Sequence, residues 1–184
     1  MGQVCCNAIV HLNPYGSQAV ALAVDLANRK PVTVGELVRR CTEAGLIIDQ
    51  AVEVEDLGRV IALLRDWERI VDAADEWARA DLVNRRLAAA AAYPRLTDHA
   101  GDGWHLHYRA DETSFIEMLD SLIFVGTALH LVGRGMHRLG RCRLAECNLI
   151  YADTSRSGRQ RYCSPRCANR DAVRRHRTML RSGA

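Results

Sequence analysis

The chain has 184 residues, of which 48% are hydrophobic, 26% charged and 5% aromatic, as in one medium domain with or without a small appendage. Its 4 prolines and 13 glycines are too few for a disordered or low-complexity chain. No apolar run approaches the roughly 20 residues of a membrane-spanning helix, and the N-terminus lacks the basic region of a secretory signal. We therefore expect a soluble, cytoplasmic protein that does not contact a membrane.

The net charge changes sign at about residue 133. Residues 1–133 hold 12 Lys and Arg against 19 Asp and Glu, a net charge of −7. Residues 134–184 hold 13 Arg against 3 acids, a net charge of +10. This asymmetry predicts an acidic body domain over 1–133 and a small basic domain over 134–184 that contacts a polyanion.

Apolar spacing predicts helices in the first part of the body. A helix over 16–29 places five apolar side chains on one face: Ala19, Val20, Ala23, Leu26 and Ala27. Thr33 and Glu36 have the spacing of a capping box that begins a second helix, and Gly45 is a suitable end for it. A long amphipathic stripe from Leu57 to Ala78, which includes Trp67, predicts a helix over about 53–78.

The rest of the body is predicted to be a helix, a hairpin and another helix. An Ala-rich helix over about 81–93 ends against Pro94. The Gly-Asp-Gly turn at 101–103, followed by alternating residues, indicates a small β-hairpin. A last helix over about 112–137 has these residues facing inward: Phe115, Leu119, Leu122, Ile123, Val125 and Leu129. The fold class is therefore mainly α, a multihelical domain with a small β-hairpin.

The basic segment has few large apolar side chains, so it needs a metal or a partner in order to fold. Four cysteines lie in it, with Cys142 and Cys147 spaced C-x4-C and Cys163 and Cys167 spaced C-x3-C. Two such pairs are a common ligand set of a closed, structural zinc site. We predict one structural zinc ion per chain, the alternative being two pairs of reduced, packed cysteines. Four cysteine ligands leave no position for a water molecule, so hydrolysis at this zinc is not expected.

The pattern around these cysteines predicts a treble-clef-like finger, a β-hairpin followed by a helix. Residues 148–153 and 159–163 read as two strands joined across Ser157 and Gly158. Ser164 and Pro165 have the character of an N-cap and a first helical residue. Cys163 would then lie just before the helix and Cys167 in its first turn.

The predicted final helix carries five arginines in one stripe about 80° wide: Arg166, Arg170, Arg174, Arg177 and Arg181. The stripe is roughly 22 Å long, and the DNA major groove accepts such a helix. Asn169 lies beside it and suits bidentate bonding to adenine. The opposite face, with Ala168, Ala172 and Met179, is expected to pack inward. The alternative is a solvated arginine face, or one docked on the acidic body.

Arginines outside the final helix are candidates for backbone contacts. Arg156, Arg159 and Arg161 lie in the predicted hairpin, where they would hold flanking phosphates. Arginine, which replaces lysine throughout this segment, favours bidentate contacts to phosphate or guanine.

Four motifs of the basic segment resemble the bacterial CGNR zinc finger: Cys142-x4-Cys147, Asp153-Thr154-Ser155-Arg156, Arg161-Tyr162-Cys163-Ser164 and Cys167-Ala168-Asn169-Arg170. Ala168 stands where that family has its namesake glycine. The body, through residues 21–28 and 34–37, is similar to the ABATE domain that accompanies this finger. The resemblance implies a stress-responsive transcription regulator, with a finger that binds zinc and DNA and a body that senses a signal or docks a partner.

Other candidate groups are better explained by packing or by surface exposure. His99, His105 and His107 could hold a second metal, but surface histidines on a strand are favoured, and packing is favoured for His130 and His137. Cys5 and Cys6 could be redox active, but packing is favoured, and Cys41 is expected in the core. For Trp67 and Trp77 a core or interface role is expected rather than a ligand cage. We find neither a nucleophile with its base and orienting group nor a glycine-rich phosphate loop. The protein is not expected to be an enzyme.

The sequence thus predicts a regulator that binds duplex DNA at the nucleoid, forms a homodimer through its body and contacts the transcription machinery. An RNA- or ribosome-binding zinc protein is the first alternative, but the basic segment offers only Tyr151 and Tyr162 for stacking on bases. The second alternative is an interaction module whose arginines dock on an acidic partner such as RNA polymerase.

Overall fold

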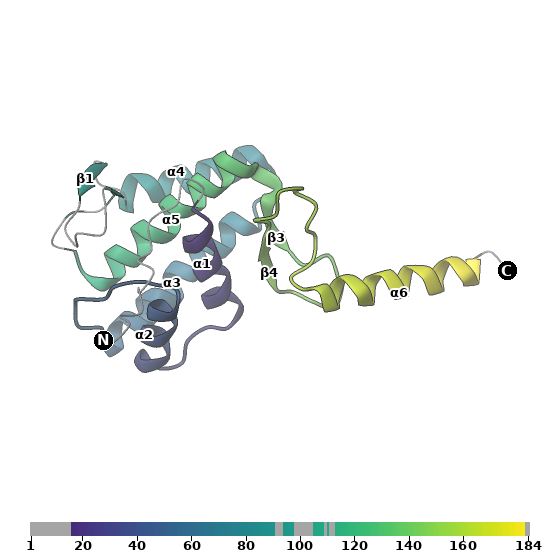
Figure 1. Ribbon diagram of the computed structural model, residues 1–184, viewed down its shortest axis with the longest axis horizontal. Helices are drawn as coiled ribbons and strands as arrows, with labels where there is room; N and C mark the ends of the chain where they lie inside the picture. Colours follow the sequence, from purple (N-terminus) through teal and green to yellow (C-terminus); the bar gives the residue numbers. More distant parts are fainter. Residues whose placement is uncertain (1–15, 91–93, 98–104, 109, 111–112, 183–184) are drawn as a thin grey trace, which may run out of the picture.

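The computed structural model describes residues 16–90, 94–97, 105–108, 110 and 113–182. The chain is mainly helical, as predicted, and Figure 1 shows a bundle of helices from which the last helix projects. The elements in chain order are α1 (Ser17–Asn28), α2 (Val34–Glu43), α3 (Val54–Val71), α4 (Glu76–Ala90), β1 (Arg95–Thr97), β2 (His105–His107), α5 (Phe115–Arg134), the 3-10 turn η1 (Met136–Arg138), β3 (Leu139–Arg141), β4 (Ile150–Ala152) and α6 (Pro165–Ser182).

Helix α5 forms the centre of the body and packs against α1, α3 and α4. Its buried residues include Phe115 and Phe124, and the hydroxyl of Thr127 accepts a 2.9 Å hydrogen bond from the buried Trp67 indole. Contrary to the sequence expectation, α5 is long and apolar enough to cross a membrane. However, 61% of its apolar window is buried inside the protein, which is typical of a core helix.

The start of the body follows its local sequence signals. All five apolar residues predicted to face inward from α1 are buried. At the N-terminus of α2, the Thr33 hydroxyl accepts a 3.1 Å hydrogen bond from the backbone N–H of Glu36. Gly16 allows α1 to approach α5 closely, because a Cβ atom at this position would lie 2.0 Å from the carbonyl oxygen of Gly126.

The single helix predicted over 53–78 is wrong, because the structure has two helices there. Helix α3 ends at Val71, and Arg79 donates hydrogen bonds of 2.9 and 3.0 Å to the terminal carbonyls of Val71 and Ile70. The Asp75 carboxylate accepts a 2.8 Å bond from the N–H of Ala78 and so caps α4. Trp77 is 87% exposed, which leaves an interface as its one remaining expected role.

The predicted body hairpin is present as strands β1 and β2, which pair antiparallel with Leu96 opposite Leu106. Its Gly-Asp-Gly turn lies outside the described residues. The helix predicted over 112–137 is shorter in the structure. Helix α5 ends at Arg134, and Gly135 follows with a φ of 114°, a conformation that favours glycine. His137 therefore lies in η1 and does not share a helix with His130.

The strand pairing predicted in the basic segment is wrong. Strand β4 pairs antiparallel with β3, which precedes it, with Gly140 opposite Tyr151. Residues 159–163 form no strand. The buried Asp153 carboxylate explains this, because it accepts hydrogen bonds from the N–H groups of Ser155 (2.9 Å) and Gln160 (3.0 Å) and folds residues 153–160 into a loop.

The β3–β4 hairpin is packed on the body. Leu139 and Ile150 belong to the same buried apolar cluster as the helices, and the hairpin contacts α1 and α3. The Asn28 side chain donates to the carbonyl of Ile150 (2.9 Å) and accepts from its N–H (2.8 Å), as a third strand would. Arg141 forms two 2.8 Å bonds to the carboxylate of Asp72. The finger is therefore joined to the body by apolar and polar contacts.

Candidate metal centre and basic helix

Two local elements position the four predicted zinc ligands. Cys142 follows β3, and a tight turn brings Cys147 next to it, with the N–H of Cys147 donating to the carbonyl of Leu144 at 2.8 Å. Cys163 lies just before α6, and Cys167 lies in the first turn of that helix, as predicted. The Ser164 hydroxyl accepts a 3.3 Å hydrogen bond from the N–H of Cys167, which confirms the predicted N-cap.

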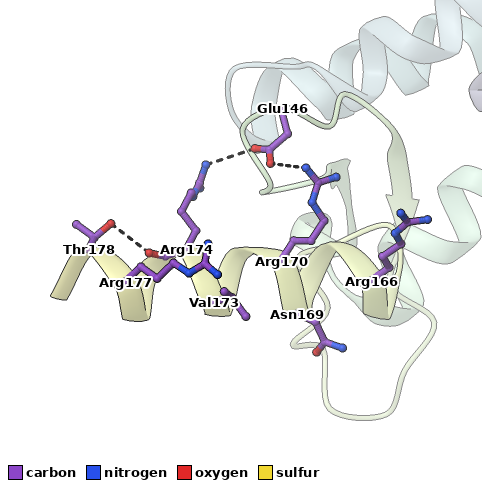
Figure 2. Close-up of a pocket in the computed structure, with 8 residues that line it drawn as sticks. All are labelled: Glu146, Arg166, Asn169, Arg170, Val173, Arg174, Arg177 and Thr178. Carbon is purple, nitrogen blue, oxygen red and sulfur yellow. Dashed lines mark hydrogen bonds and ion pairs between the residues drawn. The ribbon is translucent and has the colours of Figure 1, made fainter. Parts of the chain in front are cut away.

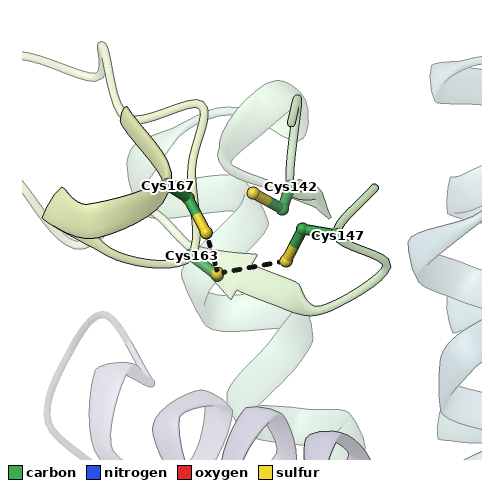
Figure 3. A group of neighbouring side chains, drawn as sticks. All are labelled: Cys142, Cys147, Cys163 and Cys167. Carbon is green, nitrogen blue, oxygen red and sulfur yellow. Dashed lines mark hydrogen bonds between the residues drawn. The ribbon is translucent and has the colours of Figure 1, made fainter. Parts of the chain in front are cut away.

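The four sulfur atoms form a compact cluster (Figure 3), in which every pair lies within 4.8 Å. The Sγ of Cys163 is 3.6 Å from that of Cys147 and 3.6 Å from that of Cys167. Such distances are too long for a disulfide. They are close to the roughly 3.8 Å edge of a tetrahedron built from zinc–sulfur bonds of about 2.3 Å. The geometry therefore fits one four-coordinate ion.

The pKa values of the closely spaced thiols also indicate that a cation is needed to stabilise their ionised form. Burial, and after it the neighbouring sulfurs, raise the pKa of the Cys163 thiol to about 12. A hydrogen bond with Ser164 lowers the pKa of Cys167. Four thiols this close cannot all ionise without a compensating positive charge, because each thiolate disfavours the next. A divalent ion that prefers sulfur supplies that charge, and zinc is the usual one for four cysteines.

Buried acids and a small apolar core support the cluster. Leu144, in the turn between Cys142 and Cys147, and Tyr151 of β4 are both buried. Asp171 is buried on α6, where it accepts a 2.8 Å hydrogen bond from the hydroxyl of Tyr162. The N–H of Arg143 donates to the carbonyl of Arg161 at 2.8 Å. This bond ties the segment before α6 to residues 142–147, the turn that carries Cys142 and Cys147 and is called the zinc turn below. The start of α6 is thereby held in a single orientation.

Helix α6 leaves this support and extends away from the body (Figure 1). Asp171 is its last buried residue, and residues 172–180 are all exposed. The expectation that Ala172 and Met179 pack inward is therefore wrong, and Met179 is 67% exposed, whereas Ala168 is half-buried. Amphipathic spacing indicated an inward face, but the direction of the helix at the zinc site leaves nothing for that face to contact.

The arginine stripe borders an open groove along α6 (Figure 2), lined by Glu146, Arg166, Asn169, Arg170, Val173, Arg174, Arg177 and Thr178. The Glu146 carboxylate lies 2.9 Å from Arg170 and 3.4 Å from Arg174, and Arg174 also pairs with Asp171 at 2.6 Å. This role of Glu146 was not predicted from the sequence, although Glu146 directly precedes the ligand Cys147. Arg181 lies in α6, but its side chain is outside the described set.

The arginines of the loop before α6 differ in their surroundings. Arg156 and Arg159 are exposed. Arg161 is half-buried and donates to the carbonyls of Gly158 (3.2 Å) and Gln160 (2.7 Å), so it stabilises the loop. Arg138, which was not singled out from the sequence, has a similar structural role, because it donates to the carbonyl of Ser155 at 2.7 Å.

The remaining candidates do not assemble a second centre within the described part of the chain, where the four cysteines are the one group placed to hold a metal. Cys41 is buried in the core as predicted, and burial raises its pKa to about 12. His130 is buried on α5. The predicted candidates Cys5, Cys6 and His99 lie outside the described residues.

A comparison with protein families matches residues 138–179 to the CGNR zinc finger. The matched segment runs from η1 into α6 and contains all four cysteines. No curated protein matches the chain. The match does not include the body, so its resemblance to the ABATE domain stays a hypothesis. Over residues 138–179 the chain therefore carries a zinc-finger domain similar to CGNR zinc fingers, with four cysteines arranged for one structural zinc ion.

Proposed function

We propose that the protein is a zinc-dependent transcription regulator that inserts α6 into the major groove of duplex DNA. One observation carries this proposal. Helix α6 has 18 residues, is about 27 Å long and projects from the zinc site, and four arginines of its stripe, Arg166, Arg170, Arg174 and Arg177, are exposed to solvent. A projecting helix of this size fits the major groove.

The charge of the finger supports a polyanionic partner. Residues 134–184 carry a net charge of +10, and a zinc ion with four thiolates lowers it by 2. The ion pairs formed by the arginines of α6 involve only acids of the finger itself among the described residues. This arrangement disfavours the alternative in which the arginine face docks on the acidic body.

The aromatic residues of the finger favour duplex DNA over single-stranded RNA. Tyr151 is buried, and the hydroxyl of Tyr162 is bonded to Asp171. The finger therefore offers at most the half-buried ring of Tyr162 for stacking on bases, whereas RNA-binding modules commonly use several exposed rings. In this proposal the protein acts in the cytoplasm on nucleoid DNA, has no catalytic reaction, and uses its body for dimerisation or for sensing a signal.

The test selects duplexes from a random library with the zinc-loaded full chain and then measures binding to selected and scrambled duplexes over a salt series. Asn169→Ala or Arg170→Ala should relax sequence preference, at a cost of about 1–3 kcal/mol at one base pair. Arg177→Ala should weaken binding to all sequences alike and lower the salt slope by about one. Arg39→Ala, at an exposed position of the body, is the charge-matched control.

Three outcomes would overturn the proposal or its details. Absence of duplex binding, or retention of an acidic protein partner in excess random duplex, would favour the interaction-module alternative. Tighter binding of single-stranded RNA than of any selected duplex would favour the RNA alternative. If Arg177→Ala changes preference and Arg170→Ala does not, α6 enters the groove in the opposite direction.

A further inference from the structure

A single carboxylate holds two arginines of the proposed DNA-binding face. One oxygen of Glu146 accepts from Arg170 at 2.9 Å, and the other lies 3.4 Å from Arg174. Figure 2 shows these three side chains meeting on one side of α6, while Asn169 and Val173 point away from Glu146. The carboxylate thus occupies donor groups of both arginines that acceptor atoms of DNA would otherwise use.

The zinc turn sets the position of Glu146. It lies between Leu144, which is buried, and the zinc ligand Cys147. The 2.8 Å hydrogen bond from the N–H of Cys147 to the carbonyl of Leu144 closes this turn and directs Glu146 toward α6. The same turn therefore supplies a metal ligand and an anion that faces the arginine stripe.

We propose that Glu146 is an internal competitor of the DNA backbone: it neutralises Arg170 and Arg174 in the free protein and limits binding to DNA of arbitrary sequence. This inference rests on the proposed DNA-binding function and adds a residue that sets the affinity for non-specific sites. A group of the DNA, whether a base edge or a phosphate, must displace the carboxylate before either arginine contributes its full charge.

Exposure makes this displacement possible. The side chain of Glu146 is 47% exposed, and those of Arg170 and Arg174 are 56% and 49% exposed. Ion pairs at such exposure are weak and exchange readily with other partners. Glu146 therefore reduces phosphate binding without preventing it, whereas a buried pair would lock the arginines in place.

The proposed role of Glu146 also predicts how the affinity for DNA depends on salt concentration. Each phosphate that the protein neutralises releases counterions and steepens the dependence of affinity on salt. Glu146 supplies one negative charge in place of such counterions, so the wild-type protein should show a slope about one unit shallower than a variant without this charge. A residue that merely positions the arginines would not change the slope in this direction.

The experiment measures binding of the zinc-loaded full chain to a labelled duplex of about 20 base pairs with random sequence, over a salt series. Glu146→Gln keeps the shape of the side chain and removes its charge. Glu43→Gln, which breaks the exposed Arg39–Glu43 pair of the body, is the control for net charge. Zinc content, measured for every variant, verifies that the finger is intact.

At low salt, Glu146→Gln should tighten binding to the random duplex about fivefold and steepen the salt slope by about one unit, whereas Glu43→Gln should change affinity less than twofold. In a background that carries Arg170→Ala and Arg174→Ala, the gain from Glu146→Gln should disappear. Unchanged or weaker binding of Glu146→Gln, or a gain that persists in that background, would overturn the inference while the proposed function stands. If no variant binds duplex, the proposed function fails and the inference falls with it.

Discussion

The body and the finger are stabilised by different means. In the body, α5 buries its apolar residues against α1, α3 and α4, as in an ordinary helical core. Two of the largest apolar residues of the finger, Leu139 and Ile150, belong to the apolar cluster of the body. The finger therefore depends on its metal site, on buried acids and on contact with the body. A segment of this size lacks the apolar surface to fold by burial alone.

The two regions also use arginine differently. In the body, the buried Arg40 pairs with Asp25 at 2.7 Å, and Arg86 pairs with Asp120. On α6 the arginines outnumber the acids within reach, which are Glu146 and Asp171. The same side chain is a structural cross-link where acids are plentiful and, in the function proposed above, an anion-binding group where they are scarce.

The largest expected effect tests whether zinc stabilises the finger but not the body. Cys163→Ser removes one of four ligands and should release the ion, because structural zinc contributes about 10–16 kcal/mol of apparent binding free energy. Residues from about Arg141 onward should lose protection from hydrogen exchange, while the body stays helical. Metal analysis and mass-resolved exchange provide the measurement. Cys41→Ala, outside the cluster, should keep one zinc per chain, and retention of zinc by Cys163→Ser would contradict the four-ligand site.

The next effect tests the independence of the body. We propose that residues 1–133 fold alone and do not bind DNA, but with lower stability than in the full chain. Loss of Leu139 and Ile150 uncovers apolar surface of the body, at a cost of about 3–6 kcal/mol. Circular dichroism during denaturant titration measures this cost. An unfolded spectrum in water would show that the body cannot fold without the finger.

A smaller effect tests the polar junction between the two regions. Asn28→Ala removes both hydrogen bonds to the backbone of Ile150 and should cost about 2–3 kcal/mol, because two buried backbone groups lose their partners. Equilibrium unfolding of the zinc-loaded chain measures the cost. Asn84→Ala, at an exposed position of α4, should be nearly neutral. Equal stability of the two variants would show that the Asn28 contacts add nothing.

The smallest effect concerns pH at the same junction. Burial lowers the pKa of His130, and the charged groups near it are Arg134, Arg138 and Asp153. The unfolded chain therefore binds a proton at His130 before the folded chain does, and stability should fall as pH drops below about 6.5. His130→Leu should reduce this slope. Thermal unfolding of both proteins between pH 7 and pH 5 provides the comparison, and identical slopes would exclude His130 as the cause.

Signals between neighbouring residues predicted much of the fold and most of the candidate site. Thr33 and Ser164 act as caps where expected, because a capping hydrogen bond spans only three residues. The four cysteines converge as predicted, since each pair is held by its own short turn. The break between α3 and α4 was missed because the apolar period continues across it, and the cap at Asp75 is its one clear local mark.

The sequence by itself determined the helical character of the chain, the cysteine ligand set and the arginine stripe, because these depend on spacing within a single element. Only the tertiary structure decided three further features. Strand β4 pairs with β3 rather than with residues 159–163, because a buried carboxylate turns that later segment into a loop. Helix α6 projects into solvent, because the zinc site sets its direction. Glu146 meets Arg170 and Arg174, which are distant in sequence, because the zinc turn brings them together.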